Sequence, residues 1–210
     1  MNDIVQSVDR ALSILEVLAD HSEDLGVTEI SDKVGLHKST VYRLLGTLIY
    51  KGYVIQSHET NKYRLTLKLF ELGNKRTKDM DILTVSKPYT KELMEKVNEV
   101  IHLVIREGNN TIYIDKVEAD NTIRMASTIG TRSPLYSTSV GKAILAYLSD
   151  KEVETIWNTS NIEKRTEHTI TSLEEMKDEL QKVRQKGYAI DDEENEIGVR
   201  CVGAPVFNRF

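Results

Sequence analysis

Apolar residues recur every three or four positions in the first part of the chain, the spacing that lines one face of an α-helix. This pattern predicts a helix over residues 7–19. A second, short helix is expected to run from a capping residue, Thr28, to Val34, because Gly35 can then end it in the left-handed conformation. The face of the first helix expected in the core comprises Val8, Ala11, Leu12, Leu15, Leu18 and Ala19.

A third helix is predicted over residues 38–51, directly after a tight turn at 35–37. Two short helices around a glycine turn are typical of a helix-turn-helix, in which the second helix enters the major groove of DNA. Gly46 lies on its polar face, where it either permits close approach to the groove or is an indifferent helix glycine. The apolar stripe is Val41, Leu44, Leu45 and Leu48, and the side chains expected to contact DNA are His37, Lys38, Ser39, Thr40, Tyr42 and Arg43.

Two short runs rich in β-branched and aromatic residues follow, at 53–55 and 63–65, and a polar loop joins them. They predict a β-hairpin of the kind that forms the wing of a winged helix. Asn61 and Lys62 lie near its tip, where they are expected to contact phosphate or the minor groove and so to position the protein on DNA. The whole pattern predicts a winged helix-turn-helix domain over residues 1–66.

The pattern changes after the wing. Residues 67–80 are charged and partly apolar, which predicts a linker helix, and residues 81–210 predict a second domain. Helices and short strands alternate there without repeats, so the chain is expected to be α+β with an antiparallel sheet in this domain. The expected helices are 89–98, 139–148, 150–158 and 172–186, and the expected strands are 100–106, 111–117, 122–125, 188–191 and 199–207.

Charge is distributed unevenly along the chain. The net charge of −5 argues against a nucleic-acid partner when it is taken whole. However, residues 33–78 hold ten basic and two acidic side chains, a local net charge of +8, whereas residues 1–32 hold one basic and eight acidic side chains. A basic block that coincides with the predicted recognition helix, wing and linker is the electrostatic footprint expected of a phosphate-binding surface.

Composition further limits the classes of protein to which the chain can belong. With 210 residues, 40% hydrophobic and 29% charged, the chain can bury a core, and no stretch approaches the roughly 18 apolar residues of a membrane span. The start has neither a secretory nor a transit-peptide pattern. A single cysteine, Cys201, excludes an internal disulfide, and the five histidines show no metal-binding spacing. The chain is therefore expected to be cytoplasmic, with no metal, cofactor or membrane partner.

An enzymatic role finds little support in the second domain. The segment 130–142 fails as a phosphate-binding loop because Tyr136 replaces a required glycine and Ala143 follows the lysine. No Ser-His-Asp set can be assigned, and Cys201 is better explained as a small buried residue than as a nucleophile. Three consecutive hydroxyl side chains do precede a predicted helix, where they either gather around an anion such as a carboxylate or simply cap the helix. They are Ser137, Thr138 and Ser139.

Several segments resemble the IclR family of bacterial transcription regulators: residues 5–12, the helix segment 38–43, and 187–201. The resemblance spans the whole chain. More narrowly, residues 63–73, 129–138 and 205–207 are similar to the branch that represses pectin and hexuronate catabolism in response to 2-keto-3-deoxygluconate.

This resemblance implies a GAF-like effector domain, dimers formed through the DNA-binding domains, tetramers in many members, and palindromic operator DNA. It also implies a pocket for a small organic acid. By the family pattern the pocket maps onto Met125, Ser139, Val140, Asp191 and Cys201, and Arg132 is expected to add a charge-assisted bond to the carboxylate. Family members normally continue beyond the position of Phe210 into another strand and a helix, so one wall of the pocket is expected to be incomplete.

The function that these observations favour is a ligand-responsive transcription regulator, more specifically a repressor. The alternatives left open are an activator, a sensor of another small keto acid, an effector domain that serves only in oligomerisation, and a concealed enzymatic activity.

Overall fold

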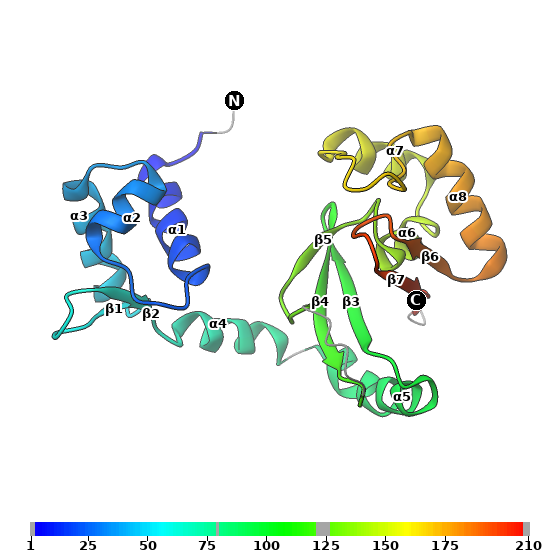
Figure 1. Ribbon diagram of the computed structural model, residues 1–210, viewed down its shortest axis with the longest axis horizontal. Helices are drawn as coiled ribbons and strands as arrows, with labels where there is room; N and C mark the ends of the chain where they lie inside the picture. The colour runs from blue at the N-terminus through cyan, green and yellow to red at the C-terminus, as the bar shows by residue number, and fades with distance from the viewer. Residues whose placement is uncertain (1–2, 79, 121–126, 208–210) are drawn as a thin grey trace. The chain divides into compact units, whose positions relative to one another are not determined.

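The computed structural model describes residues 3–78, 80–120 and 127–207. The chain divides into two compact units, Met1–Asp81 and Ile82–Phe210, called here the N-terminal and C-terminal units. Figure 1 shows helices and a hairpin in the first, and a sheet flanked by helices in the second. The α+β class with antiparallel pairing is confirmed.

The N-terminal unit is a winged helix, as predicted. Its helices α1 (Gln6–Ala19), α2 (Val27–Val34) and α3 (Lys38–Tyr50) contact one another, and β1 (Val54–Gln56) pairs antiparallel with β2 (Tyr63–Leu65). Backbone hydrogen bonds in both directions between Leu25 and Tyr63 tie the hairpin to the segment before α2. The core consists of Ile14, Leu15, Leu18, Leu25, Ile30, Val41, Leu45, Leu48, Val54 and Tyr63.

The predicted core face of α1 is partly wrong. Its buried residues are Ile14, Leu15 and Leu18, whereas Val8 and Leu12 are 55% and 53% exposed. Ala19 is exposed as well, and Ala11 is partly buried against the core cluster. The physical reason is that α1 packs on α2 and α3 through the side of the helix that carries Ile14, Leu15 and Leu18, and Val8, Leu12 and Ala19 lie outside that contact.

The start of α2 also differs from expectation. The helix begins at Val27 with Gly26 as its N-cap, so Thr28 lies inside the first turn. The Gly26 N–H donates to Glu29 Oε2 at 2.7 Å, which satisfies one of the free donors at the helix start without a hydroxyl cap. At the other end Gly35 is left-handed, with φ of 65°, as predicted.

Two helices follow the wing. The linker helix is present as α4 (Lys68–Thr77), but α5 (Asp81–Val97) begins well before the expected residue 89 and contains Pro88 in its interior. Proline removes one helical hydrogen bond, yet the helix continues through it. The apolar side chains on either side of the proline keep helical spacing: Ile82, Val85, Tyr89, Leu93 and Val97.

The C-terminal unit is built on an antiparallel sheet. Strand β3 (Ile101–Glu107) pairs with β4 (Asn110–Val117), and β4 pairs with β5 (Arg132–Pro134). The expected strand 122–125 lies outside the described residues, and β5 had not been predicted. A second hairpin pairs β6 (Ala189–Asp192) with β7 (Arg200–Gly203). Strand β7 is shorter than the expected 199–207, because Pro205 has no N–H to continue a ladder.

Three helices, α6 (Ser139–Leu145), α7 (Asp150–Thr159) and α8 (Leu173–Lys186), complete this unit. Helix α6 contacts β6, β7, α8 and the sheet strands β3 and β4. The core lies among these helices and β6: Leu135, Tyr136, Ala143, Leu145, Ala146, Val153, Ile156, Met176, Leu180, Val183 and Ala189. Within the described chain, no helix has the combination of length and hydropathy needed to cross a membrane.

Candidate functional site

Helix α3 separates apolar and polar side chains as a recognition helix requires. Val41 and Leu45 have no exposed surface, whereas Tyr42 is 66% exposed and Arg43 is also exposed. His37 is the N-cap residue in an extended conformation, which places it at the tip of the helix. Of the expected contacts, His37, Lys38, Ser39, Tyr42 and Arg43 are exposed and Thr40 is half-buried.

The turn before α3 is fixed by Ser31, a buried residue of α2. Its hydroxyl donates to the Leu36 carbonyl at 2.5 Å, and the Leu36 N–H donates to the Ser31 carbonyl at 3.1 Å. With Gly35 left-handed between them, these bonds set the direction in which α3 leaves α2. The N-terminal turn of α3 is therefore held by the core rather than by its own cap.

The tip of the wing presents Asn61 and Lys62. Asn61 is left-handed with φ of 57°, and its carbonyl accepts a bond of 3.1 Å from Gln56 Nε2. Lys62 Nζ lies 3.9 Å from Glu29 Oε2, and both side chains are about half exposed. Such an exposed pair contributes at most about 1 kcal/mol, so Lys62 can exchange Glu29 for a phosphate.

The three hydroxyl residues before α6 are all buried, with 0% of Ser137, 4% of Thr138 and 3% of Ser139 exposed. Thr138 caps the helix: its Oγ1 accepts from the Gly141 N–H at 3.1 Å and donates to the Pro134 carbonyl at 2.9 Å. The Ser137 hydroxyl donates to Asn195 Oδ1 at 3.2 Å. Capping therefore explains one of the three hydroxyls, and a contact with the segment after β6 explains another.

Asp191 and Cys201 face each other across the β6–β7 hairpin. Asp191 is 3% exposed, and its Oδ1 accepts the backbone N–H groups of Glu194 at 2.8 Å and Asn195 at 3.3 Å. Burial raises the pKa of the Asp191 carboxyl. Burial, and then the charge of Asp191, raises the pKa of the Cys201 thiol, which favours the protonated and unreactive form.

The hairpin and α6 touch at Gly203. A β-carbon built on this residue would lie 2.7 Å from the Ser139 carbonyl carbon and 2.7 Å from the Val140 nitrogen. Together with the Ser137–Asn195 bond, this contact brings Asp191 and Cys201 next to the start of α6. Of the residues expected at the effector pocket, the structure thus gathers Ser137, Thr138, Ser139, Val140, Asp191 and Cys201.

Two expected pocket residues do not join this group. Arg132 lies on β5, is about half exposed and forms an ion pair with Glu107, so its guanidinium is engaged on the surface. Met125 lies outside the described residues.

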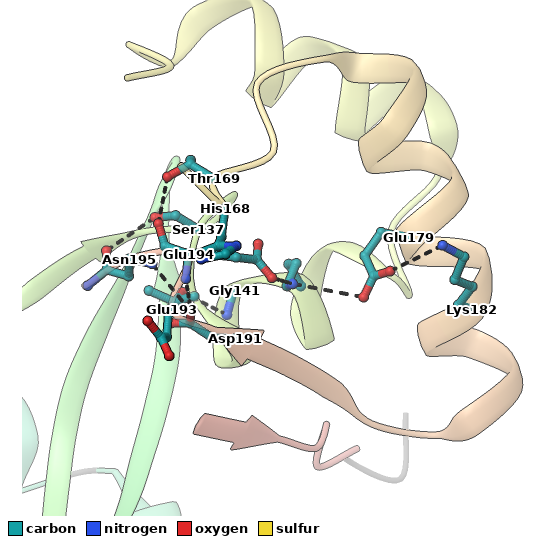
Figure 2. Close-up of polar contacts among 12 residues, drawn as sticks. Ser137, Gly141, His168, Thr169, Glu179, Lys182, Asp191, Glu193, Glu194 and Asn195 are labelled. Atoms are coloured by element: carbon teal, nitrogen blue, oxygen red, sulfur yellow. Dashed lines mark hydrogen bonds and ion pairs between the residues drawn. The ribbon is translucent and has the colours of Figure 1, made fainter. Parts of the chain in front are cut away.

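A buried ionic network beside the site was missed by the sequence analysis. Lys142 in α6 has no exposed surface and pairs with Glu194, while Glu179 of α8 lies 3.9 Å from Lys142 Nζ. Burial raises the pKa of the Glu194 carboxyl, although Lys142 acts in the opposite direction. Figure 2 shows Glu194 between Asp191 and the Glu179 side chain. The sequence did offer one indication of this network. Lys142 is a charged residue between Gly141 and Ala143, in a predicted helix of otherwise small and apolar residues.

The segment 193–195, two of whose N–H groups bond Asp191, also accepts hydrogen bonds at its backbone carbonyls. The Thr169 hydroxyl donates to the Glu194 carbonyl at 2.6 Å, and the Thr166 hydroxyl donates to the Glu193 carbonyl at 2.6 Å. The backbone that bonds Asp191 is thus also held by two threonine hydroxyls. Among the described residues, no group of three or more His, Cys, Asp or Glu side chains is arranged to hold a metal ion.

Comparison with known proteins gives a consistent result. Residues 7–58 match the IclR helix-turn-helix domain, and residues 74–210 match the model described as bacterial transcriptional regulator IclR C-terminal. The chain is 43% identical over 208 residues to the HTH-type transcriptional regulator KdgR of Dickeya chrysanthemi, a match covering 99% of this chain and 68% of that protein.

KdgR of Escherichia coli K12 is also 43% identical over 208 residues, with 99% of this chain and 79% of that protein covered. Among solved structures, the IclR of Thermotoga maritima superposes with a TM-score of 0.77 at 34% identity, covering 98% of this chain and 83% of that one. The chain therefore belongs to the IclR family of transcriptional regulators, which are DNA-binding proteins and not enzymes.

Proposed function

We propose that the protein is a repressor that leaves its operator, or binds it differently, when a small organic acid binds the C-terminal unit. Residues 1–66 bind DNA, residues 67–80 connect the two parts, and residues 81–210 bind the effector. The effector shifts the population between operator-competent and operator-incompetent arrangements of paired winged helices. With operator DNA as its partner, the protein acts in the cytoplasm.

The observation that carries the DNA-binding part is the polar face of α3. Val41 and Leu45 anchor the helix in the core, and this leaves Tyr42 and Arg43 exposed one and two positions away. In the proposed complex the first turns of α3 lie in the major groove, where His37, Lys38, Ser39, Thr40, Tyr42 and Arg43 contact bases and phosphates, while Asn61 and Lys62 contact the backbone.

A second copy of the chain is the partner that fits the exposed start of α1. Four apolar side chains there are more than half exposed: Ile4, Val5, Val8 and Leu12. Pairing two such surfaces buries them and presents two recognition helices with two-fold symmetry, which suits a palindromic operator. Larger assemblies through the C-terminal unit, such as tetramers, are compatible with this arrangement.

The effector we propose is a sugar acid such as 2-keto-3-deoxygluconate. Support comes from the similarity of residues 63–73, 129–138 and 205–207 to the branch that responds to this acid, and from the polar group gathered at the start of α6. In this group Ser137, Thr138, Ser139 and Val140 lie beside Asp191 and Cys201. Arg132 is not retained, because its cross-strand partner is Ile112, so its side chain lies on the opposite face of the sheet from the buried Thr111.

The DNA-binding proposal is tested with Arg43→Ala on DNA that carries the regions upstream of neighbouring genes. We expect the wild type to bind with log affinity falling steeply with log salt concentration, and Arg43→Ala to lose specific binding. The matched control is Arg165→Ala, which removes the same charge from an exposed position of the C-terminal unit. A flat salt dependence, or equal losses in both variants, would contradict the proposal.

A further inference from the structure

The loop that follows β6 holds the Asp191 side chain in one orientation. Glu193 has a left-handed backbone with φ of 61°, which is uncommon outside glycine. It turns the chain so that the N–H groups of Glu194 and Asn195 return to Asp191 Oδ1, at 2.8 and 3.3 Å. Because both bonds go to the same oxygen, the direction of the Asp191 carboxylate depends on the conformation of residues 193–195.

This loop is anchored to α6 at two positions. The buried Lys142 ammonium pairs with the buried Glu194 carboxylate, and the Ser137 hydroxyl donates to Asn195 Oδ1 at 3.2 Å. Ser137 lies just before α6, and Lys142 lies one turn into it. The ion pair therefore connects the loop that orients Asp191 to the helix whose first turn contributes the hydroxyl residues of the candidate effector site.

Glu194 is the main partner of the buried ammonium. Glu179 of α8 lies 3.9 Å from Lys142 Nζ, but its side chain is 25% exposed and also lies 3.7 Å from Lys182 Nζ (Figure 2). The Glu194 side chain is 9% exposed, and among the described residues Lys142 is the only cation paired with it. The contact between Lys142 and Glu194 is therefore the one that can fix the position of the loop.

Two threonine bonds hold the loop from elsewhere and do not replace this anchor. The Thr166 and Thr169 hydroxyls donate to the carbonyls of Glu193 and Glu194, both at 2.6 Å. Both threonines belong to the segment between α7 and α8, so they tie the loop to that segment and not to α6. Without the ion pair the loop would keep these bonds but lose its charged contact with the helix.

We infer that Lys142 and Glu194 are positioning residues of the effector site: their ion pair fixes residues 193–195 and so holds the Asp191 carboxylate in a set orientation relative to the start of α6. This inference rests on the proposed effector function and deepens it. Two apolar side chains of similar volume would fill the same space at a lower cost in desolvation, but they would not fix the direction of Glu194. The pair therefore acts on effector affinity more than on stability.

The test looks for a change in affinity without a change in stability in Lys142→Met/Glu194→Gln, a double variant that removes both charges at once. Isothermal titration calorimetry with 2-keto-3-deoxygluconate is expected to show an affinity about 10- to 100-fold below that of the wild type, the range for removing groups that orient metal ligands. The urea midpoint should stay close to the wild-type value, because no unpaired charge is left buried. An ion pair that only stabilised the core would leave the affinity of this folded variant unchanged.

The matched control is Lys177→Met/Glu154→Gln. This pair joins α8 to α7 in the same unit at 2.6 Å, and its side chains are 39% and 47% exposed. Among the described residues, neither of its side chains bonds α6 or the loop 193–195. We expect this variant to bind the acid with wild-type affinity.

A double-mutant cycle with Asp191→Ala shows whether the ion pair acts through Asp191. If it does, the losses do not add, and Asp191→Ala/Lys142→Met/Glu194→Gln binds the acid about as weakly as Asp191→Ala alone. Losses that add in the triple variant would mean that the pair affects binding without Asp191.

The positioning role is overturned if the double variant binds the acid like the wild type, if its affinity falls only together with its urea midpoint, or if the losses add in the triple variant. Wild-type binding with no loss in the double variant leaves the effector proposal intact. If the wild type itself does not bind the acid, the effector proposal fails, and the positioning role fails with it.

Discussion

Lys142 and Glu194 form an ion pair in which the lysine side chain has no exposed surface and the glutamate side chain is 9% exposed. The other carboxylate oxygen, Glu194 Oε2, is buried and has no hydrogen-bond partner among the described residues. Burying two charges is costly, and an unpaired acceptor adds to that cost, so this pair is not an efficient way to stabilise a core. The pair lies between α6 and the backbone that bonds Asp191, where it can hold the proposed effector site in place.

Lys142→Met is expected to destabilise the C-terminal unit by about 3–5 kcal/mol, because it leaves the Glu194 charge buried without its cation. The double variant Lys142→Met/Glu194→Gln should recover most of this loss. Urea unfolding followed by the fluorescence of Trp157 measures both, since this is the single tryptophan and it packs against the core of this unit. A double variant as unstable as the single one would show that the loss comes from packing and not from charge.

The same carboxyls predict a pH dependence of stability. Burial raises the pKa of Glu194 above 4.5 and that of Asp191 above 3.8. Above those values the folded protein therefore binds more protons than the unfolded chain, and the free energy of unfolding falls as pH rises through the raised pKa values.

Urea midpoints of the C-terminal unit, measured by Trp157 fluorescence from pH 4 to 8, test this dependence. Glu194→Gln is expected to flatten the fall, whereas Glu174→Gln, at an exposed position of α8, should keep it. Equal slopes in all three proteins would contradict the assignment to Glu194.

Local periodicity predicted the winged helix well, because the residues of each element are enough to indicate its type and where it ends. The stripe Val41, Leu45 and Leu48 and the left-handed Gly35 are readable from adjacent residues. The predictions from sequence were wrong where contacts with neighbouring elements determine which side chains are buried. The start of α1 is apolar yet exposed. The early start of α5 was missed for a different reason: Pro88 predicts a helix boundary, whereas Val85 and Tyr89 keep helical spacing across it.

The grouping of residues at the proposed effector site could be predicted only in part, because it also depends on contacts between elements. Ser137, Thr138 and Ser139 are adjacent in sequence, so their grouping could be inferred. Their proximity to Asp191 depends on the β6–β7 register and on the contact at Gly203, which no local pattern encodes.

Gly203→Ala should weaken effector binding by displacing the hairpin from α6. The new β-carbon would lie 2.7 Å from backbone atoms of Ser139 and Val140, which cannot rotate away as a side chain can. We expect a loss of stability of about 1–3 kcal/mol, as for other overpacked positions, and at least a tenfold lower effector affinity by calorimetry. Val202→Ala, one residue earlier and 71% exposed, is the control that should leave both unchanged.

Gly46→Ala separates the two explanations for the glycine on the polar face of α3. Nothing lies within 4 Å of a β-carbon at this position, so the substitution is expected to stabilise the N-terminal unit by about 1 kcal/mol through helix propensity. If the groove wall passes close to this residue, operator affinity should fall at least tenfold in the same protein.

Gly73→Ala in α4 is the matched control, because its β-carbon also meets nothing within 4 Å in the isolated chain. It should give a similar gain in stability, measured by circular dichroism, without a change in operator affinity. A rise in stability combined with a loss of DNA binding at position 46 alone would place the groove against this turn of α3. Unchanged binding by Gly46→Ala would instead show that the glycine is indifferent and that the contact region ends near Arg43.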